Sequence, residues 1–310
     1  MVAAAADPKE RNAAVTRRFL LAGLAGFGLA GWSHAAMARQ GTPRIVALDA
    51  PATEMLVALG VEPVGVAGLA GYRAAEGDLP ALRRAVDIGF YYEPNLELLQ
   101  ALAPECFIGS FGIGAPPALL ERIAPVMTMP IYGGAGSTYD AACAAMSRAG
   151  QVTGRDSEAA SFLAAHAQHL SELATRVSGR ILRPLYLATP LLDGRHVILY
   201  GENSLFDAVM RRVGLRNAFT GPASAWGIAS VGIEQLAADP DASFVYIASP
   251  VTRNALKQLH SSAIWSLLPF VVEGRVAPIS YLEMYGALPT ADRFAAALGG
   301  LLDTDVLDAG

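Results

Sequence analysis

The sequence predicts an α/β fold in which two lobes, each built on its own central sheet, are joined by one long helix. Short apolar runs of strand length alternate with helical segments along the chain, which is typical of βα units. Between two such sets of elements, residues 157–177 have the apolar spacing of one helix face, with Leu163, Leu170 and Leu173 on it. The elements before and after this helix follow a similar order, which indicates two related halves.

The long helix sets the expected domain organisation. At about 1.5 Å per residue it extends roughly 30 Å, about the width of a small domain, so it can hold two lobes at a fixed spacing. We therefore expect an N-terminal lobe at 39–150, a linking helix within 151–179 and a C-terminal lobe at 180–310. The alternative is an ordinary surface helix of a single α/β domain.

The first 38 residues are expected to be an export signal. Basic residues precede the apolar run 19–32, which is too short for a permanent membrane helix, and small residues suit cleavage near Ala38. Thr16, Arg17 and Arg18 with the following apolar residues resemble the twin-arginine export motif, which a receptor reads. Ordinary secretion is the alternative. Either route predicts a periplasmic mature protein.

Charge and cysteine content exclude some partners. Residues 39–310 carry 19 Lys and Arg against 26 Asp and Glu, a net charge of −7. Such a surface favours neither nucleic acid nor an acidic phospholipid surface. Cys106 falls in an apparent buried strand and Cys143 on an Ala-rich helix, so both are interpreted as small core residues, with a disulfide between them as the alternative.

In the first lobe, apolar runs predict the strands, and prolines at helix starts and glycines at helix ends mark several of the helices. The loop 110–114 follows a strand at its carboxyl end, where open α/β sheets bind ligands. The segment 68–80, rich in small residues, is expected to be a loop carrying Tyr72 and Arg73. Strands are expected at 44–48, 64–67, 106–109 and 126–129, and helices at 51–60, 96–102, 117–123 and 138–150.

The second lobe repeats this order. Helix 96–102, a proline, strand 106–109 and Ser110 have a counterpart in helix 233–238, a proline, strand 244–248 and Ser249. The two halves therefore look like copies of one plan. Strands are expected at 184–188, 197–200, 244–248 and 276–279, and helices at 203–213, 233–238, 263–268 and 290–302.

Signatures of catalysis and of a resident metal do not occur. The chain has no G-x-S-x-G, P-loop or H-E-x-x-H motif, and the glycines at 112 and 114 lack the rest of a dinucleotide fingerprint. His166 and His169 could supply two metal ligands, but a site needs three or four, and a solvated helix face is the simpler interpretation. We expect no enzymatic activity, no cofactor and no metal ligated by the protein. An exported enzyme with an unrecognised site is the alternative.

Aromatic residues at loop positions indicate a ligand-binding cleft between the lobes. An aromatic side chain in a loop is less readily explained by core packing than one on the apolar face of a helix or strand. Burial of one such ring against a ligand contributes roughly 1.5–3 kcal/mol, so three reach about the 8 kcal/mol of micromolar binding before ordering costs. The aromatic residues expected in loops are Tyr91, Tyr92, Phe111, Trp226, Tyr281 and Tyr285.

Several separate segments share one resemblance. They are 87–89 (DIG), 93–99 (EPNLELL), 122–125 (RIAP), 201–206 (GENSLF), 226–227 (WG), 233–237 (IEQLA) and 285–287 (YGA). In this order, across residues 44–302, they resemble the periplasmic iron(III)-hydroxamate siderophore-binding proteins of ABC importers, which are class III, helical-backbone binding proteins. The resemblance implies two α/β lobes bridged by a long helix, a shallow cleft that closes little, and delivery to a membrane permease with a cytoplasmic ATPase.

The resemblance also implies particular site residues. Trp226 matches a tryptophan of the family's cleft and Tyr285 an aromatic residue there. Tyr91 stands where the family has an arginine that bonds the iron-bound hydroxamate oxygens, and Ile113 stands where it has a tyrosine. A tyrosine offers one hydroxyl, whereas an arginine offers several charge-assisted donors, so a binder of cobalamin, haem or another chelate is the alternative. The expected ligand-binding residues are Trp226, Tyr285, Tyr91, Tyr92, Phe111, Ile113, Tyr72 and Met284.

Two further expectations follow from the resemblance. Arg73 is a candidate substitute for the missing arginine, with a solvated loop arginine as the simpler interpretation. In related importers an acidic side chain on each lobe docks on permease arginines, and Glu121 and Glu234 are the candidates here, with simple surface solvation as the alternative.

The expected partners are an iron(III)-siderophore that carries its own iron, the permease with its ATPase, and the twin-arginine export machinery. The protein is expected to be a monomer.

Overall fold

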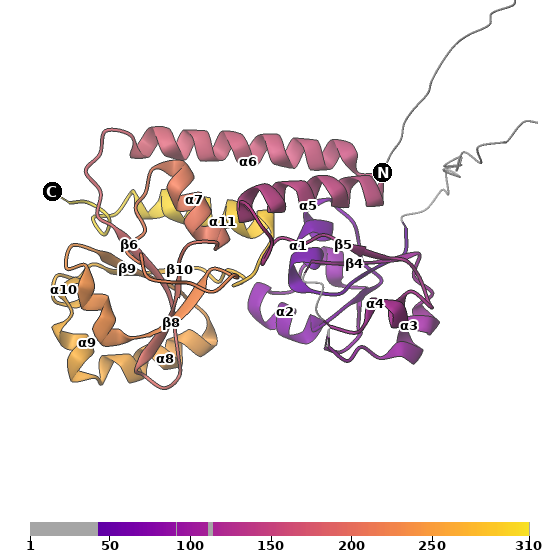
Figure 1. Cartoon of the computed structure of the whole chain (residues 1–310), viewed down its shortest axis with the longest axis horizontal. Helices are drawn as coiled ribbons and strands as arrows, with labels where there is room; N and C mark the ends of the chain where they lie inside the picture. The colour runs from indigo at the N-terminus through magenta and orange to yellow at the C-terminus, as the bar shows by residue number, and fades with distance from the viewer. Residues whose placement is uncertain (1–42, 91, 111–113, 310) are drawn as a thin grey trace, which may run out of the picture. The chain divides into compact units, whose positions relative to one another are not determined.

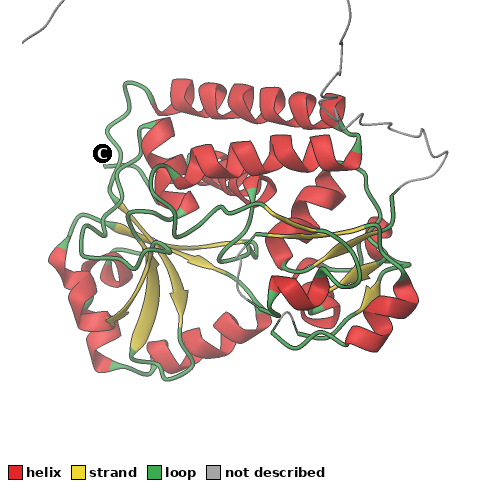
Figure 2. Ribbon diagram, turned by 45° about the vertical axis from the view of Figure 1, so that its right-hand side comes forward, coloured by secondary structure: helices red, strands yellow, loops and turns green. Residues whose placement is uncertain are grey.

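Two five-stranded sheets organise the chain in the structure, a computed structural model that describes residues 43–90, 92–110 and 114–309. The strand order is β3-β2-β1-β4-β5 in the first sheet and β10-β9-β6-β7-β8 in the second. Helices pack around both sheets (Figure 2), which confirms the predicted α/β class with a central sheet in each half. The predicted export signal at 1–38 lies outside the described residues.

The first sheet is parallel throughout, because each connection between its paired neighbours crosses over through at least one helix. Its strands are β1 (Ile45–Ala47), β2 (Gly65–Val66), β3 (Val86–Asp87), β4 (Cys106–Gly109) and β5 (Val126–Thr128). The helices between them are α1 (Ala50–Ala58), α2 (Leu69–Glu76), the 3-10 helix η1 (Pro80–Leu82), α3 (Leu96–Leu102) and α4 (Pro117–Leu120).

The second sheet is mixed, so the prediction of two copies of one plan is only partly right. Its strands are β6 (Leu185–Pro190), β7 (His196–Tyr200), β8 (Ile228–Gly232), β9 (Ser243–Ile247) and β10 (Val276–Ile279). The parallel strands of the second sheet, β6, β9 and β10, are neighbours in the same order as β1, β4 and β5 of the first sheet. Strand β7 differs, because it is antiparallel to both of its neighbours, β6 and β8. The reason is the connection: residues 191–195 are too few for a crossover, so β6 and β7 form a hairpin.

The predicted long helix is confirmed as α6 (Asp156–Val177). It packs on α5 (Thr138–Thr153), which follows the first sheet, and on α7 (Leu205–Val213) and α11 (Leu288–Leu301), which belong to the second half (Figure 1). α11 also contacts α1 and α5. Contacts between the halves are therefore made by several helices, and the domain boundaries proposed from the sequence remain predictions. The other helices are η2 (Ile233–Ala238), α8 (Pro250–His260), α9 (Ala263–Leu267) and α10 (Pro269–Val272).

The expectation of a loop at 68–80 is wrong, because its first part is the helix α2. The carboxylate of Asp87, the last residue of β3, accepts a hydrogen bond from the first turn at Ala70 N (2.9 Å), and Leu69 is buried. This cap comes from a residue far along the chain, so a local pattern does not show it. Tyr72 and Arg73 therefore lie on a helix, and Arg73 donates to the carbonyl of Leu82 at 2.5 Å.

One apolar core runs through both halves. It joins side chains of α1, α5, α6, α7 and α11, among them Leu56, Met146, Leu173, Phe206 and Phe294. Two smaller clusters cover the second sheet and the other face of the first. Because close-packed side chains resist displacement, the shared core holds the two halves in fixed positions, and with them the loops that follow the strands of each sheet. Cys106 is buried and Cys143 half-buried, and both thiols are free.

Candidate functional site

Three aromatic rings from separate segments meet in one cluster. Tyr132 lies after β5, Trp226 in the turn before β8, and Tyr285 between β10 and α11. The Tyr132 and Trp226 rings stack with centroids 6.0 Å apart and planes 7° apart, and Tyr285 meets them edge-on at 5.5 and 5.2 Å. Tyr132 is buried, whereas Trp226 and Tyr285 are half-buried and keep surface for a ligand. The structure thus brings together the two rings that the sequence singled out, and adds Tyr132.

The Trp226 side chain is presented by a turn that requires glycine. Gly227 has φ +77°, and a Cβ on it would lie 2.0 Å from the backbone nitrogen of Ser204. The carbonyl of Gly227 accepts a hydrogen bond from Gly201 N at 2.9 Å, which ties the turn to the end of β7. On the other side, Gly133 brings its backbone near the indole, since a Cβ there would lie 3.9 Å from Nε1 of Trp226. The indole therefore lies beside backbone of the first half, on a turn that is tied to the second half.

The segment that carries Tyr285 is held by hydrogen bonds from the first half. The hydroxyl of Tyr132 donates to the carbonyl of Gly286 at 2.7 Å. The next residue, Ala287, donates its N–H to Glu54 of α1 at 2.8 Å. A Cβ on Gly286 would lie 2.2 Å from Oγ1 of Thr290, so glycine is needed for the segment to turn into α11.

Glu54 is the buried centre of this contact. It is 3% exposed, and it accepts hydrogen bonds from Thr290 Oγ1 at 2.6 Å and from Arg293 at 2.9 Å, besides that from Ala287. Burial raises the pKa of Glu54 from 4.5 to about 7, although Arg293 and the hydrogen-bond donors act in the opposite direction. Arg293 also pairs with Glu76 of α2. One arginine thus serves two buried carboxylates.

The remaining predicted site residues lie apart from the cluster or beside it. Met284 is half-buried and packs against the shared core. Next to it, Glu283 accepts a hydrogen bond from the Tyr281 hydroxyl at 2.9 Å, and burial raises the pKa of Glu283. Tyr72 instead lines a cavity of about 300 Å³ between α1, α2, α6 and α11, together with Glu54 and Phe162.

The first half contributes exposed aromatic residues after β3. Tyr92 is 59% exposed in the turn that leads to α3, and Phe90 is 76% exposed. Three other predicted residues, Tyr91, Phe111 and Ile113, lie outside the described residues. Ser110, which precedes Phe111 in the chain, is fixed, because its backbone N–H donates to the buried carboxylate of Asp49 at 2.5 Å. Arg73, the candidate substitute for the family's arginine, bonds Leu82 O and lies 3.9 Å from Asp78.

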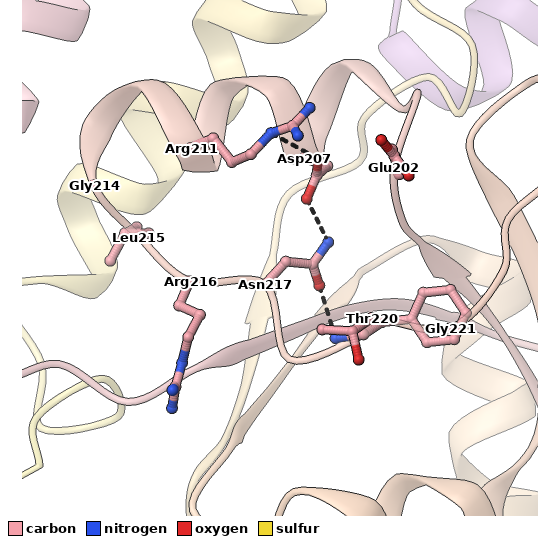
Figure 3. Close-up of a pocket in the computed structure, with 10 residues that line it drawn as sticks. Glu202, Asp207, Arg211, Gly214, Leu215, Arg216, Asn217, Thr220 and Gly221 are labelled. Atoms are coloured by element: carbon pink, nitrogen blue, oxygen red, sulfur yellow. Dashed lines mark hydrogen bonds and ion pairs between the residues drawn. The ribbon is translucent and has the colours of Figure 1, made fainter.

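A larger hollow, of about 680 Å³, lies elsewhere on the second half and includes no predicted site residue. Three of its polar side chains, Asp207, Arg211 and Asn217, are linked to one another (Figure 3). Arg211 pairs with Asp207 at 3.1 Å, and Asn217 donates to Asp207 at 2.9 Å while accepting from Phe219 N at 3.0 Å. These bonds hold the end of α7 against the following loop, so we interpret the hollow as structural.

The interpretation of His166 and His169 as a solvated helix face is wrong. His166 is 1% exposed, and the Nδ1 atoms of both histidines lie 2.8 and 3.0 Å from one carboxylate oxygen of Asp292 on α11. The ring of Tyr139 stacks on His166. The pair therefore joins α6 to α11.

Within residues 43–90, 92–110 and 114–309, no group of three or more His, Cys, Asp or Glu side chains has the arrangement of a metal site.

Both candidate permease contacts are at the surface. Glu121 follows α4 and Glu234 lies in the first turn of η2, and both side chains are exposed. Among the described residues, no helix has the length and apolar character needed to cross a membrane.

The fold and these motifs define a two-lobed binding protein, and comparison with known proteins gives its family. The family model described as periplasmic binding protein matches residues 45–280, and the chain belongs to this family. It is 32% identical over 285 residues to the iron(3+)-hydroxamate-binding protein FhuD of Escherichia coli (strain K12), covering 92% of this chain and 95% of that protein.

Solved structures agree with this assignment. The siderophore-binding protein FhuD of Vibrio cholerae, bound to Fe3+–Desferal, superposes with a TM-score of 0.76 at 26% identity, covering 84% of this chain and 98% of that one. The triscatecholate siderophore-binding protein FeuA of Bacillus subtilis has a TM-score of 0.68 at 18% identity, covering 86% and 94%, and shows the shared fold alone. The resemblance seen in the sequence motifs is thus confirmed.

Proposed function

We propose that this protein is the substrate-binding component of an ABC importer, which captures an iron(III)-hydroxamate siderophore in the periplasm and passes it to a membrane permease with a cytoplasmic ATPase. The observation that carries the proposal is the 32% identity, over nearly the whole chain, to a protein that binds iron(III)-hydroxamate. The ligand would lie against Trp226 and Tyr285, with Tyr91, Tyr92, Phe111 and Ile113 on the other rim. It catalyses no reaction, and iron arrives inside the chelate, with no cofactor and no metal ligand from the protein.

A hydroxamate is favoured over a catecholate by the charge of the segments that the sequence assigns to the cleft. The segments 88–95, 110–116, 129–137, 218–227 and 280–287 contain no Lys or Arg, and they contain Glu93 and Glu283. A ferric tris-catecholate is strongly anionic and needs cationic side chains, whereas a ferric tris-hydroxamate is neutral and can rely on aromatic contact and single hydroxyl donors. Tyr91 in place of an arginine fits the second kind of ligand.

Export and assembly are part of the same proposal. The leader at 1–38, with its paired arginines Arg17 and Arg18, would direct the chain through the twin-arginine machinery, and cleavage near Ala38 would leave a monomeric protein in the periplasm. Docking on the permease would use Glu121 and Glu234, one on each half.

Fluorescence titration tests the ligand class. The full chain is titrated with a ferric hydroxamate (Fe3+–Desferal), a ferric catecholate, cobalamin and haem. Binding is followed by tryptophan quenching and, for the variant without Trp226, by the absorbance of the bound chelate in equilibrium dialysis. We expect saturable quenching with the hydroxamate, and an affinity at least about tenfold weaker in Trp226→Ala, because one buried aromatic contact of about 1.5–3 kcal/mol is removed. Trp265→Phe, in the core of the second sheet, is the matched control and should bind as the wild type.

Three results would contradict this assignment. Tightest binding of cobalamin or haem would replace the siderophore as ligand, and an unchanged affinity in Trp226→Ala would remove the aromatic cluster from the site. Turnover of an offered compound would instead indicate an exported enzyme.

A further inference from the structure

The segment Tyr285 to Ala287 links the candidate site to the interior of the protein. Each of its three residues is held by a different group: the Tyr285 ring by Tyr132 and Trp226, the Gly286 carbonyl by the Tyr132 hydroxyl, and the Ala287 N–H by Glu54. The position of the Tyr285 ring is therefore set by Tyr132 and Glu54 of the first half together with Trp226 of the second half, to which Tyr285 itself belongs.

Glu54 acts on this segment as an external helix cap. Ala287 is the N-cap residue of α11, and an alanine side chain has no acceptor for the free N–H groups of the first turn. The Glu54 carboxylate instead holds the start of the helix from outside, with one oxygen accepting from the N–H of the N-cap residue Ala287 and the other from the Thr290 hydroxyl in the first turn. A negative charge at a helix N-terminus also interacts favourably with the helix dipole.

The surroundings of Glu54 make the contact sensitive to a single substitution. The side chain is 2% exposed, so a lost acceptor leaves a buried N–H or hydroxyl without a partner. Arg293, bound to both Glu54 and Glu76, is the shared counter-charge, and Tyr72 of α2 packs nearby. Changing Glu54 therefore disturbs the start of α11, which is where the segment carrying Tyr285 ends.

We propose that Glu54 is a positioning residue for ligand binding, which holds the Tyr285 ring against Trp226 by capping α11 from the opposite half of the molecule. The part that concerns ligand affinity rests on the function proposed above. The part that concerns the placement of Tyr285 does not.

The test uses the full chain with Trp32→Phe and Trp265→Phe, so that Trp226 is the only tryptophan. Glu54→Gln keeps the size of the side chain and removes its charge, and Tyr132→Phe keeps the ring and removes the bond to Gly286. Asp292→Asn is the matched control, because it weakens another polar contact of α11, that with His166 and His169, and leaves the cluster alone. The measurements are acrylamide quenching of Trp226 without ligand, affinity for Fe3+–Desferal, and the urea midpoint.

In Glu54→Gln and Tyr132→Phe we expect the quenching constant of Trp226 to rise about twofold and the dissociation constant for Fe3+–Desferal about tenfold. Glu54→Gln takes an acceptor from a buried donor, and Tyr132→Phe takes the donor from the Gly286 carbonyl. Asp292→Asn should lower the urea midpoint without changing either value. Unchanged quenching of Trp226 in both variants overturns the proposal, even if their stability falls, because a purely structural role would give that result. If the parent chain does not bind Fe3+–Desferal, the proposed ligand is wrong, and the quenching constants still decide the role of Glu54.

Discussion

Gly227 lies so close to Ser204 that a Cβ on the glycine would stand 2.0 Å from the serine backbone nitrogen. Ser204 is also the N-cap of α7, where its side chain accepts a hydrogen bond from Asp207 N. The turn that presents Trp226 is therefore packed directly on the start of a helix, and neither backbone can move away cheaply.

Gly227→Ala is expected to destabilise the protein strongly. The added methyl group meets backbone atoms of Ser204, and the residue has φ +77°, which costs an L residue about 1–2 kcal/mol by itself. Gly60→Ala is the matched control, since Gly60 has φ +69° and its Cβ would have nothing within 4 Å. In urea denaturation we expect a loss of about 1 kcal/mol for the control and at least about 3 kcal/mol for Gly227→Ala. Equal losses in the two variants would show that the contact with Ser204 adds nothing.

The pKa of Glu54 predicts a pH dependence of stability. Burial raises this pKa from 4.5 to about 7, so the folded state holds the proton more tightly than the unfolded state does. The stabilisation of the folded state by protonated Glu54 is fully present below pH 4.5 and is lost as the pH rises through about 7. By linkage this stabilisation amounts to on the order of 3 kcal/mol. Between pH 5 and 8, urea midpoints of the wild type should fall more than those of Glu54→Gln. Parallel curves for the two proteins would contradict this.

Most of the fold could be predicted from local patterns. Helix 96–102 and strands 106–109 and 276–279 agree with α3, β4 and β10 to the residue, because apolar period, caps and flanking prolines all point the same way. The helix α8 was missed although its capping box, Ser249 with Thr252, is readable in the sequence. The helix α2 could not be read, because the acceptor at its start is Asp87, from another element.

The candidate site was only partly predictable for a similar reason. Trp226 and Tyr285 stood out because they are aromatic residues in loops that also match family motifs. Tyr132 follows a strand among small residues, and nothing local shows that its hydroxyl reaches Gly286, 154 residues away. Glu54 looks like an ordinary helix glutamate, and only the packing of α1 on α11 makes it buried. Such contacts depend on the whole fold and leave no periodic signal.

Asp292 is expected to contribute to stability through the two histidines of α6. The hydrogen bond from His166, with that from His169, holds the pKa of Asp292 below its usual range of about 3.8. The stabilisation by ionised Asp292 is thus fully present above about pH 3.8 and is lost as the pH falls through the lower pKa of the folded state. At pH 7, Asp292→Ala should lower the free energy of unfolding by about 1–2 kcal/mol, since His166 is buried with its partner removed. His169→Ala, at the more exposed ring, is the control and should cost less.

Arg212 offers a test of which contact joins α7 to α5. Its guanidinium carbon lies 3.7 Å from the centroid of the Tyr139 ring, and it also pairs with Asp140 at 3.0 Å. The Asp140 side chain is 72% exposed, so the ion pair contributes little, whereas the planar guanidinium stacks on the ring. Arg212→Lys should therefore cost about 0.5–1 kcal/mol, and Asp140→Asn less. If the two losses in urea are reversed in size, the ion pair is the dominant contact.

Charge reversal tests the proposed docking of both halves on the permease. Glu121 and Glu234 are exposed, one on each half, and opposite charges across an interface direct docking, whereas like charges cost several kcal/mol. The double variant Glu121→Arg with Glu234→Arg should reduce uptake of the chelate by about tenfold or more, while its affinity in fluorescence titration stays that of the wild type. Glu172→Arg, an exposed glutamate on α6, is the matched control and should transport normally. Full transport by the double variant would exclude these two residues as the docking contacts, and a matching fall in chelate affinity would place their effect on ligand binding instead.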